Sequence, residues 1–85
     1  KWNILYFDDQ IQNINTYREL LSDSFNLIGC QDSTVYPKLL QENHPHVILL
    51  DVHMPILNGF ELYRRITENP LYNGCPILFI SGDQS

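Results

Sequence analysis

The amino-acid sequence predicts an α/β protein built on a doubly wound parallel sheet. Short apolar runs alternate along the chain with segments of helical period, which is the pattern of βαβ units. The runs are apolar at successive positions, as expected of parallel strands that are buried on both faces. A βα unit takes roughly 24 residues, so the 85 residues hold one core and are too few for an eight-unit barrel. Because parallel crossovers are nearly always right-handed, we expect an open sheet with helices on both faces.

Four segments are predicted to form the strands of this sheet. Three of them are continuous apolar runs that end at a polar residue: 4–7, 47–50 and 77–80. The fourth segment, 25–30, contains Gly29, which weakens a strand, and we therefore expect it at an edge of the sheet.

Three helices are predicted between the strands. The first covers about residues 10 to 23, and its apolar stripe is formed by Ile11, Ile14, Leu20 and Leu21. The second contains Val35, Leu39 and Leu40, with Pro37 in its first turn and a cap at Ser33 or Thr34. The third begins at Asn58-Gly59 and ends at Asn69-Pro70, and its stripe is Phe60, Tyr63 and Ile66 with Leu62 beside them.

Composition and charge exclude several classes of protein. Ten acidic residues against five basic ones give a net charge of −5, which repels nucleic acid and anionic membranes. No apolar run approaches the ~18 residues of a membrane span, and we expect no secretory signal, because the first residues lead into an apolar run without a small-residue cleavage site. The two cysteines, Cys30 and Cys75, form no close pair and are interpreted as small buried hydrophobic residues, so a reducing cytoplasm is expected.

Polar side chains follow three of the predicted strands at the point where each strand ends. Asp8 and Asp9 follow the run 4–7, Asp51 follows 47–50 and Ser81 follows 77–80. Parallel strands end at one edge of the sheet, which is where such folds bind ligands. A single aspartate there is more often a turn or cap residue, but three carboxylates together repel one another unless a cation compensates them. Oxygen ligands of this kind suit Mg²⁺ or Mn²⁺.

A carboxylate beside such a cation can attack phosphorus as a nucleophile. Asp51 is the best candidate because it stands alone after the most hydrophobic strand, whereas Asp8 and Asp9 form a pair suited to holding the ion. Ser81 can donate a hydrogen bond to a phosphoryl oxygen.

Three segments, 4–9, 47–59 and 76–82, resemble the receiver domain of two-component response regulators. The most specific parts are the acidic pair and the Asp-x-x-Met-Pro-x-x-x-Gly stretch that begins at Asp51. The resemblance implies a flavodoxin-like receiver fold in which Asp51 is the phosphoacceptor and Ser81 the switch hydroxyl. It also implies that Mg²⁺ is held by Asp8, Asp9, Asp51 and the backbone carbonyl of His53.

The same resemblance implies partners and exposes two departures from the family pattern. Phosphate would come from a sensor histidine kinase, a phosphotransfer protein or a small phosphodonor, and the output would lie in an effector domain outside this chain or in a homodimer. We expect residues 1–85 to be one receiver domain without its fifth strand, where the family carries an essential lysine that neither Lys1 nor Lys38 replaces. The second departure is Gly82, where the family more often has alanine.

Three functions are compatible with these residues. The first is a phosphorylatable signalling module with no external substrate, and therefore not an enzyme in the usual sense. The second is a fragment of a Mg²⁺-dependent phosphohydrolase that forms an aspartyl phosphate, in which His53 would replace the usual second carboxylate. The third is a receiver-like interaction domain that is never phosphorylated.

Overall fold

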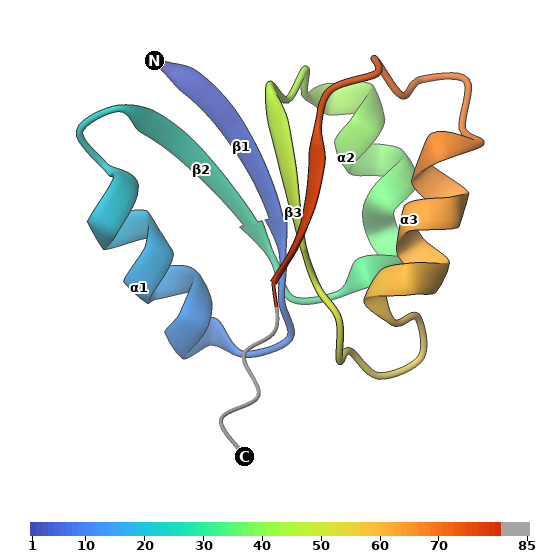
Figure 1. Ribbon diagram of the computed structural model, residues 1–85, viewed down its shortest axis with the longest axis horizontal. Helices are drawn as coiled ribbons and strands as arrows, with labels where there is room; N and C mark the ends of the chain where they lie inside the picture. The colour runs from blue at the N-terminus through green and yellow to red at the C-terminus, as the bar shows by residue number, and fades with distance from the viewer. Residues whose placement is uncertain (81–85) are drawn as a thin grey trace.

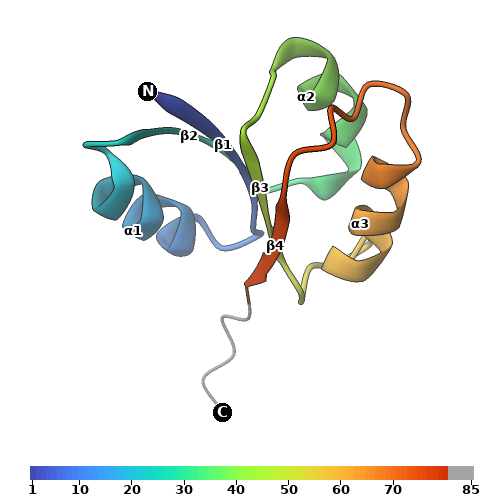
Figure 2. The same cartoon turned by 45° about the horizontal axis from the view of Figure 1, so that its top comes forward.

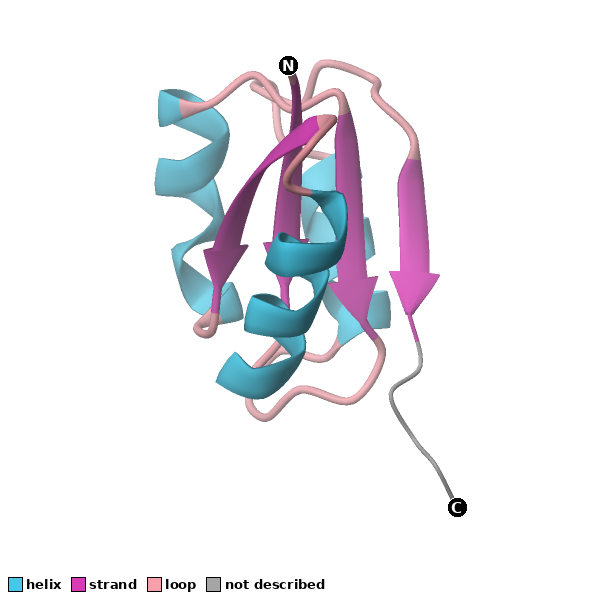
Figure 3. Ribbon diagram, turned by 90° about the vertical axis from the view of Figure 1, so that its left-hand side faces the viewer, coloured by secondary structure: helices cyan, strands magenta, loops and turns pink. Residues whose placement is uncertain are grey.

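The computed structural model describes residues 1–80, and these form a four-stranded parallel sheet (Figure 1). The strands are β1 (Trp2–Phe7), β2 (Phe25–Cys30), β3 (Val47–Asp51) and β4 (Ile77–Ile80), in the spatial order β2-β1-β3-β4. The four predicted strands are therefore confirmed, and β2 lies at an edge as expected. All four strands end on the same side of the molecule (Figure 3).

The helices lie on both faces of the sheet. Helix α1 (Ile11–Leu21) covers one face, while α2 (Tyr36–Glu42) and α3 (Gly59–Thr67) cover the other (Figures 1 and 2). The prediction of a doubly wound sheet is thus confirmed. Among residues 1–80, no helix has the length and apolar character needed to cross a membrane.

Alternation along the strands divides the core into two clusters, one on each face of the sheet. The cluster under α2 and α3 contains nine buried residues: Leu5, Phe7, Leu40, Ile48, Leu50, Met54, Leu57, Leu62 and Ile66. The cluster under α1 contains four: Ile4, Tyr6, Ile14 and Leu49. Because side chains alternate along a strand, Asp51 lies on the same face as Leu49, on the side of α1.

The predicted apolar stripe of α1 is partly wrong. Leu20 is 72% exposed, and the residues that pack on the sheet with Ile14 are Tyr17 and Leu21. Positions 14, 17 and 21 follow helical spacing, whereas Leu20 lies six residues after Ile14, about a third of a turn away from that line.

The predicted stripe of α3 is wrong in a similar way. Leu62 and Ile66 are fully buried, while Phe60 and Tyr63 are exposed. Their rings instead lie against Phe79 of β4, with centroids 5.1 and 5.6 Å from it. Helix α3 therefore faces the sheet through Leu62 and Ile66 and leans its aromatic side chains toward β4.

The start of the α2 segment also differs from the prediction. A short 3₁₀ turn, η1 (Ser33–Val35), precedes the helix, and its cap is Asp32, whose carboxylate accepts a hydrogen bond from the N–H of Thr34. Ser33 is buried and does not cap the helix, because its hydroxyl donates to the carbonyl of Leu57. Pro37 lies in the first turn of α2, as expected.

Candidate metal centre at the carboxyl ends of the strands

Three aspartates meet at the carboxyl ends of two neighbouring strands. Asp8 and Asp9 directly follow β1, and Asp51 is the last residue of β3, with Phe7 and Leu50 in register. One carboxylate oxygen of each lies within 4.8 Å of the others. The structure therefore brings together the three acidic residues that the sequence singled out, while their roles remain predictions.

Asp8 is buried and held by three hydrogen bonds. Its Oδ1 accepts from the backbone N–H of Gln10 at 2.9 Å, and its Oδ2 accepts from the Tyr6 hydroxyl at 2.5 Å and from the Asn13 amide at 3.1 Å. Burial, reinforced by the hydrogen bond to Asp8, raises the pKa of the Tyr6 phenol well above its usual range. Tyr6 therefore remains a hydrogen-bond donor at neutral pH.

Asp51 is nearly as buried as Asp8 but has fewer partners. Within residues 1–80 its carboxylate accepts one hydrogen bond, from the backbone N–H of His53 at 3.2 Å. Burial raises the pKa of Asp51, and repulsion from Asp8 and Asp9 raises it further, while the His53 hydrogen bond acts in the opposite direction. The carboxylate is thus held weakly and is open to a new bond.

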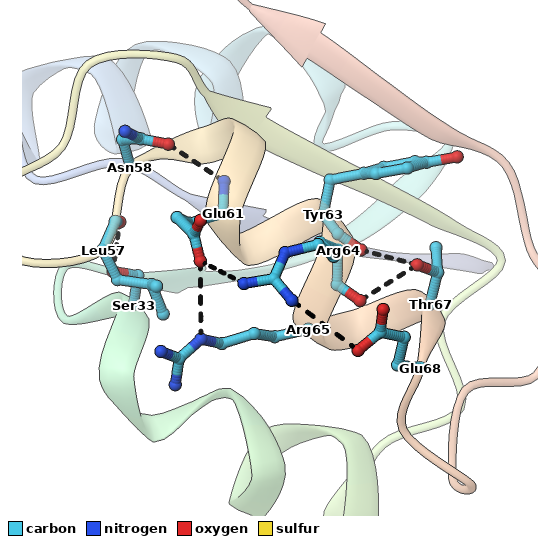
Figure 4. Close-up of polar contacts among 9 residues, drawn as sticks. All are labelled: Ser33, Leu57, Asn58, Glu61, Tyr63, Arg64, Arg65, Thr67 and Glu68. Carbon is cyan, nitrogen blue, oxygen red and sulfur yellow. Dashed lines mark hydrogen bonds and ion pairs between the residues drawn. The ribbon is translucent and has the colours of Figure 1, made fainter.

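Within residues 1–80, no lysine or arginine forms an ion pair with these carboxylates. The ion pairs found in residues 1–80 all lie on the outer side of α3, between Arg64 or Arg65 and the glutamates Glu61 and Glu68 (Figure 4). Lys1 donates to the carbonyl of Ser22, and Lys38 lies in α2. Three close carboxylates with no lysine or arginine partner within residues 1–80 form the oxygen donor set that hard cations such as Mg²⁺ take, so the residues fit the predicted ion.

Gly59, at the end of the loop between β3 and α3, lies against the backbone of Asp51 and Val52. The N–H of Gly59 donates to the carbonyl of Val52 at 3.1 Å, and a Cβ at Gly59 would lie 2.4 Å from the carbonyl oxygen of Asp51. Glycine therefore permits α3 to begin against the end of β3. The Asn58 side chain caps the helix by accepting from the N–H of Glu61 (Figure 4).

The same loop has a second tie, from the buried Ser33. Its hydroxyl donates to the carbonyl of Leu57 at 2.8 Å (Figure 4). Between these ties, an open depression of about 500 Å³ is lined by Val52, His53, Met54, Asn58 and Phe60. Two residues of this lining, Val52 and His53, directly follow Asp51 in the chain.

Sequence reasoning missed two residues of the site. It also proposed roles for Ser81 and His53 that stay predictions. Tyr6 and Asn13 were missed, although Tyr6 lies two residues before Asp8, which directly follows β1, and this spacing along extended backbone favours the same face. Ser81 lies outside the described residues. His53 is placed by its N–H contact with Asp51, and its carbonyl as an ion ligand remains a prediction.

Comparison with known proteins decides the family. The model of the response regulator receiver domain matches residues 4–85. The chain belongs to this family. Receiver domains are the parts of two-component systems that interact with histidine kinases and phosphotransfer proteins, and the family typically binds Mg²⁺ at an acidic pocket.

Individual receiver-containing proteins are similar over nearly the whole chain. Protein RcaC of Microchaete diplosiphon is 32% identical over 79 residues, which cover 92% of this chain and 12% of that protein. The response regulator protein GraR of Staphylococcus haemolyticus is 30% identical over 78 residues, covering 92% of this chain and 34% of that one. This receiver sequence thus spans about a third of the length of GraR and less of RcaC.

Solved structures show the same fold. The chemotaxis protein CheY4 of Vibrio cholerae superimposes with a TM-score of 0.87 at 26% identity, covering 99% of this chain and 71% of that chain. A sensor protein from Polaromonas superimposes with a TM-score of 0.89 at 14% identity, covering 98% of this chain and 67% of that one, which shows the fold alone. The predicted flavodoxin-like receiver fold is confirmed.

Proposed function

We propose that this receiver domain accepts a phosphoryl group on Asp51 with the help of Mg²⁺. The observation that carries the proposal is the position of Asp51: it ends β3 beside Asp8 and Asp9, is buried, and accepts a single hydrogen bond from the described chain. A carboxylate held this loosely beside a cation site has the geometry of a nucleophile.

The chemistry follows from the groups present. A carboxylate oxygen of Asp51 attacks the phosphorus of a phosphohistidine, the P–O bond forms as the P–N bond breaks, and the electron pair leaves with the imidazole. Asp8, Asp9, Asp51 and the His53 carbonyl would hold Mg²⁺, which supplies positive charge against the carboxylates and the phosphoryl oxygens. The Ser81 hydroxyl would donate to a phosphoryl oxygen of the product.

The proposed role is that of a signalling switch and not of an enzyme with an external substrate. A sensor histidine kinase or a phosphotransfer protein would supply the phosphoryl group, and its removal would reset the domain. The phosphorylated form would alter contacts with an effector domain or with a second copy of the chain. We propose that phosphorylation and dephosphorylation take place in the cytoplasm.

The test is phosphorylation by a small phosphodonor in the presence of Mg²⁺. Mass spectrometry should find one added phosphoryl group with the acid stability and base lability of an acyl phosphate, and chelation of Mg²⁺ should prevent the reaction. Asp51→Asn should abolish labelling, whereas Asp23→Asn, which changes an exposed aspartate after α1, should not.

Two results would contradict the proposal. Label that persists in Asp51→Asn would show that another residue is the acceptor. A wild-type chain that binds Mg²⁺ but is never labelled, by the small donor or by a phosphorylated histidine protein, would favour the phosphorylation-independent interaction domain.

A further inference from the structure

A tyrosine lies in the core directly beneath the acidic cluster. Tyr6 is fully buried on the α1 face, and its ring meets that of Tyr17 edge to face at a centroid distance of 5.3 Å. A buried phenol needs a hydrogen-bond partner, and the partner of Tyr6 is the Oδ2 of Asp8, 2.5 Å away. The core of the α1 face thus contacts the candidate metal centre through one hydroxyl.

The hydrogen bonds of Asp8 leave little of its carboxylate free. A carboxylate has about four acceptor positions, two on each oxygen. Tyr6 and Asn13 use both positions of Oδ2, and the N–H of Gln10 uses one position of Oδ1. One acceptor position on Oδ1 remains for a cation or its bound water, and the plane of the carboxylate is fixed by donors on both oxygens.

Fixing this plane matters because of the neighbouring charges. The carboxylates of Asp9 and Asp51 have oxygens within 4.8 Å of an Asp8 oxygen, so an untethered Asp8 would turn to increase those distances. Asp51, with its single hydrogen bond from His53, has no comparable restraint within residues 1–80. The structure therefore holds one acidic residue rigidly and leaves the proposed nucleophile free.

We propose that Tyr6 is a positioning residue for cation binding: its hydroxyl holds Asp8 in the orientation that the ion requires. This inference rests on the proposed function, because it assumes that Asp8 is part of a Mg²⁺ site. Hydrogen-bond partners of metal ligands typically change metal affinity about 10–100-fold when they are removed. Tyr6 contributes one of three such bonds, so its effect is expected at the lower end of that range.

The test is a Mg²⁺ titration of the 85-residue chain followed by NMR. Amide signals of Gln10 and His53 report on the site, whereas Trp2 lies at the opposite end of β1 and is a poor reporter. Tyr6→Phe keeps the buried ring and removes the hydroxyl, and should raise the Kd for Mg²⁺ about tenfold. Tyr17→Phe is the matched control: within residues 1–80 its hydroxyl has no hydrogen bond, and the Kd should not change.

Thermal unfolding separates positioning from a purely structural role. A structural role would lower the Tm of Tyr6→Phe equally with and without Mg²⁺, whereas a positioning role also reduces the increase in Tm that Mg²⁺ produces. Asn13→Ala removes the other donor to Oδ2 from the half-buried side of α1 and should also raise the Kd. It decides the question if Tyr6→Phe does not fold.

The outcomes are distinguishable from those of the proposed function. The inference would be overturned, and the proposed function left standing, if the Kd of Tyr6→Phe for Mg²⁺ stays within a factor of about two of the wild-type value. If Tyr6→Phe does not fold, the same criterion applies to Asn13→Ala. Absence of any Mg²⁺ binding by the wild type would overturn both.

Discussion

The two faces of the sheet are built differently. Under α2 and α3 lie nine buried apolar residues, whereas the cluster under α1 has four, one of which is a tyrosine hydrogen-bonded to an aspartate. On the α1 side, Leu78 of β4 is 54% exposed. The first face carries the larger apolar core, and the second is a thin core that continues into the acidic cluster.

One face of the sheet therefore contributes most of the apolar packing, and the other face carries the acidic side chains of the candidate site. Asp51 shares the α1 face with Leu49 and Tyr6, so the side chains proposed for phosphoryl transfer lie where apolar packing is smallest. Substitutions under α3 should therefore change mainly the free energy of unfolding, and substitutions at the ends of β1 and β3 should change mainly ion binding.

The largest effect is expected from a truncation in the α2/α3 core. Leu62 is fully buried, so Leu62→Ala should lower the free energy of unfolding by about 2–5 kcal/mol, measured by urea denaturation. Leu20→Ala, on the exposed side of α1, should stay within about 0.5 kcal/mol of the wild type. Equal losses in the two variants would show that α3 is not the helix on which the core depends.

A smaller effect on stability, together with an effect on the ion site, is expected at Gly59. A Cβ there would collide with the carbonyl of Asp51, so Gly59→Ala should cost about 1–3 kcal/mol and weaken Mg²⁺ binding by displacing the end of β3. Gly74→Ala is the control, because Gly74 has a φ of +82° but open space around it. That variant should lose about 1–2 kcal/mol and keep its Mg²⁺ affinity.

Asp51→Asn should change the free energy of unfolding by less, and in the absence of an ion it should raise it. Because the pKa of Asp51 is raised in the folded state, the folded chain binds this proton more tightly than the unfolded chain. Stability therefore falls as pH rises from the ordinary pKa of 3.8 toward the folded value. The variant avoids this loss, so without Mg²⁺ it should be more stable than the wild type at neutral pH.

Urea denaturation across pH, with and without Mg²⁺, checks this expectation. The advantage of the variant should vanish below the ordinary pKa, and Mg²⁺ should reverse it by stabilising the wild type alone. A variant that is less stable than the ion-free wild type at neutral pH would mean that repulsion in the acidic cluster is already compensated.

The smallest effect is expected at the open edge of the sheet. Within residues 1–80, β4 pairs only with β3, and Leu78 and Phe79 are exposed. Such an edge is a template for pairing with a second copy of the chain. Light scattering should detect association that rises with concentration, and Leu78→Lys should weaken it several-fold, or by less than about 1.4 kcal/mol.

Leu71→Lys is the matched control, because Leu71 is similarly exposed, at 52%, but lies outside β4. Association weakened equally by both substitutions would show that general surface hydrophobicity, and not the β4 edge, is responsible. A monomer at all concentrations would show that the edge strand is not a pairing surface.

The sequence by itself determined the fold class, the strands and the position of Asp8, Asp9 and Asp51 at one edge of the sheet. These predictions depend on properties that do not need atomic detail. Apolar runs on both faces indicate parallel strands, and parallel strands that share a sheet must end at one edge. Residues placed directly after such strands therefore lie at that edge, however the helices pack. The adjacency of β1 and β3 in the structure then brings the three carboxylates together.

Only the tertiary structure decided which sides of the helices are buried and what holds the site. The apolar side chains of α3 span nearly half of its circumference, so its position over the sheet determined that Leu62, and not Phe60, enters the core. In the hydrophobic pattern, Tyr6 is one more apolar residue of a buried strand. Hydrophobic periodicity does not register a hydroxyl, although the two-residue spacing favours Tyr6 and Asp8 on one face. The hydrogen bond between them and the second donor, Asn13 of α1, came from the tertiary structure.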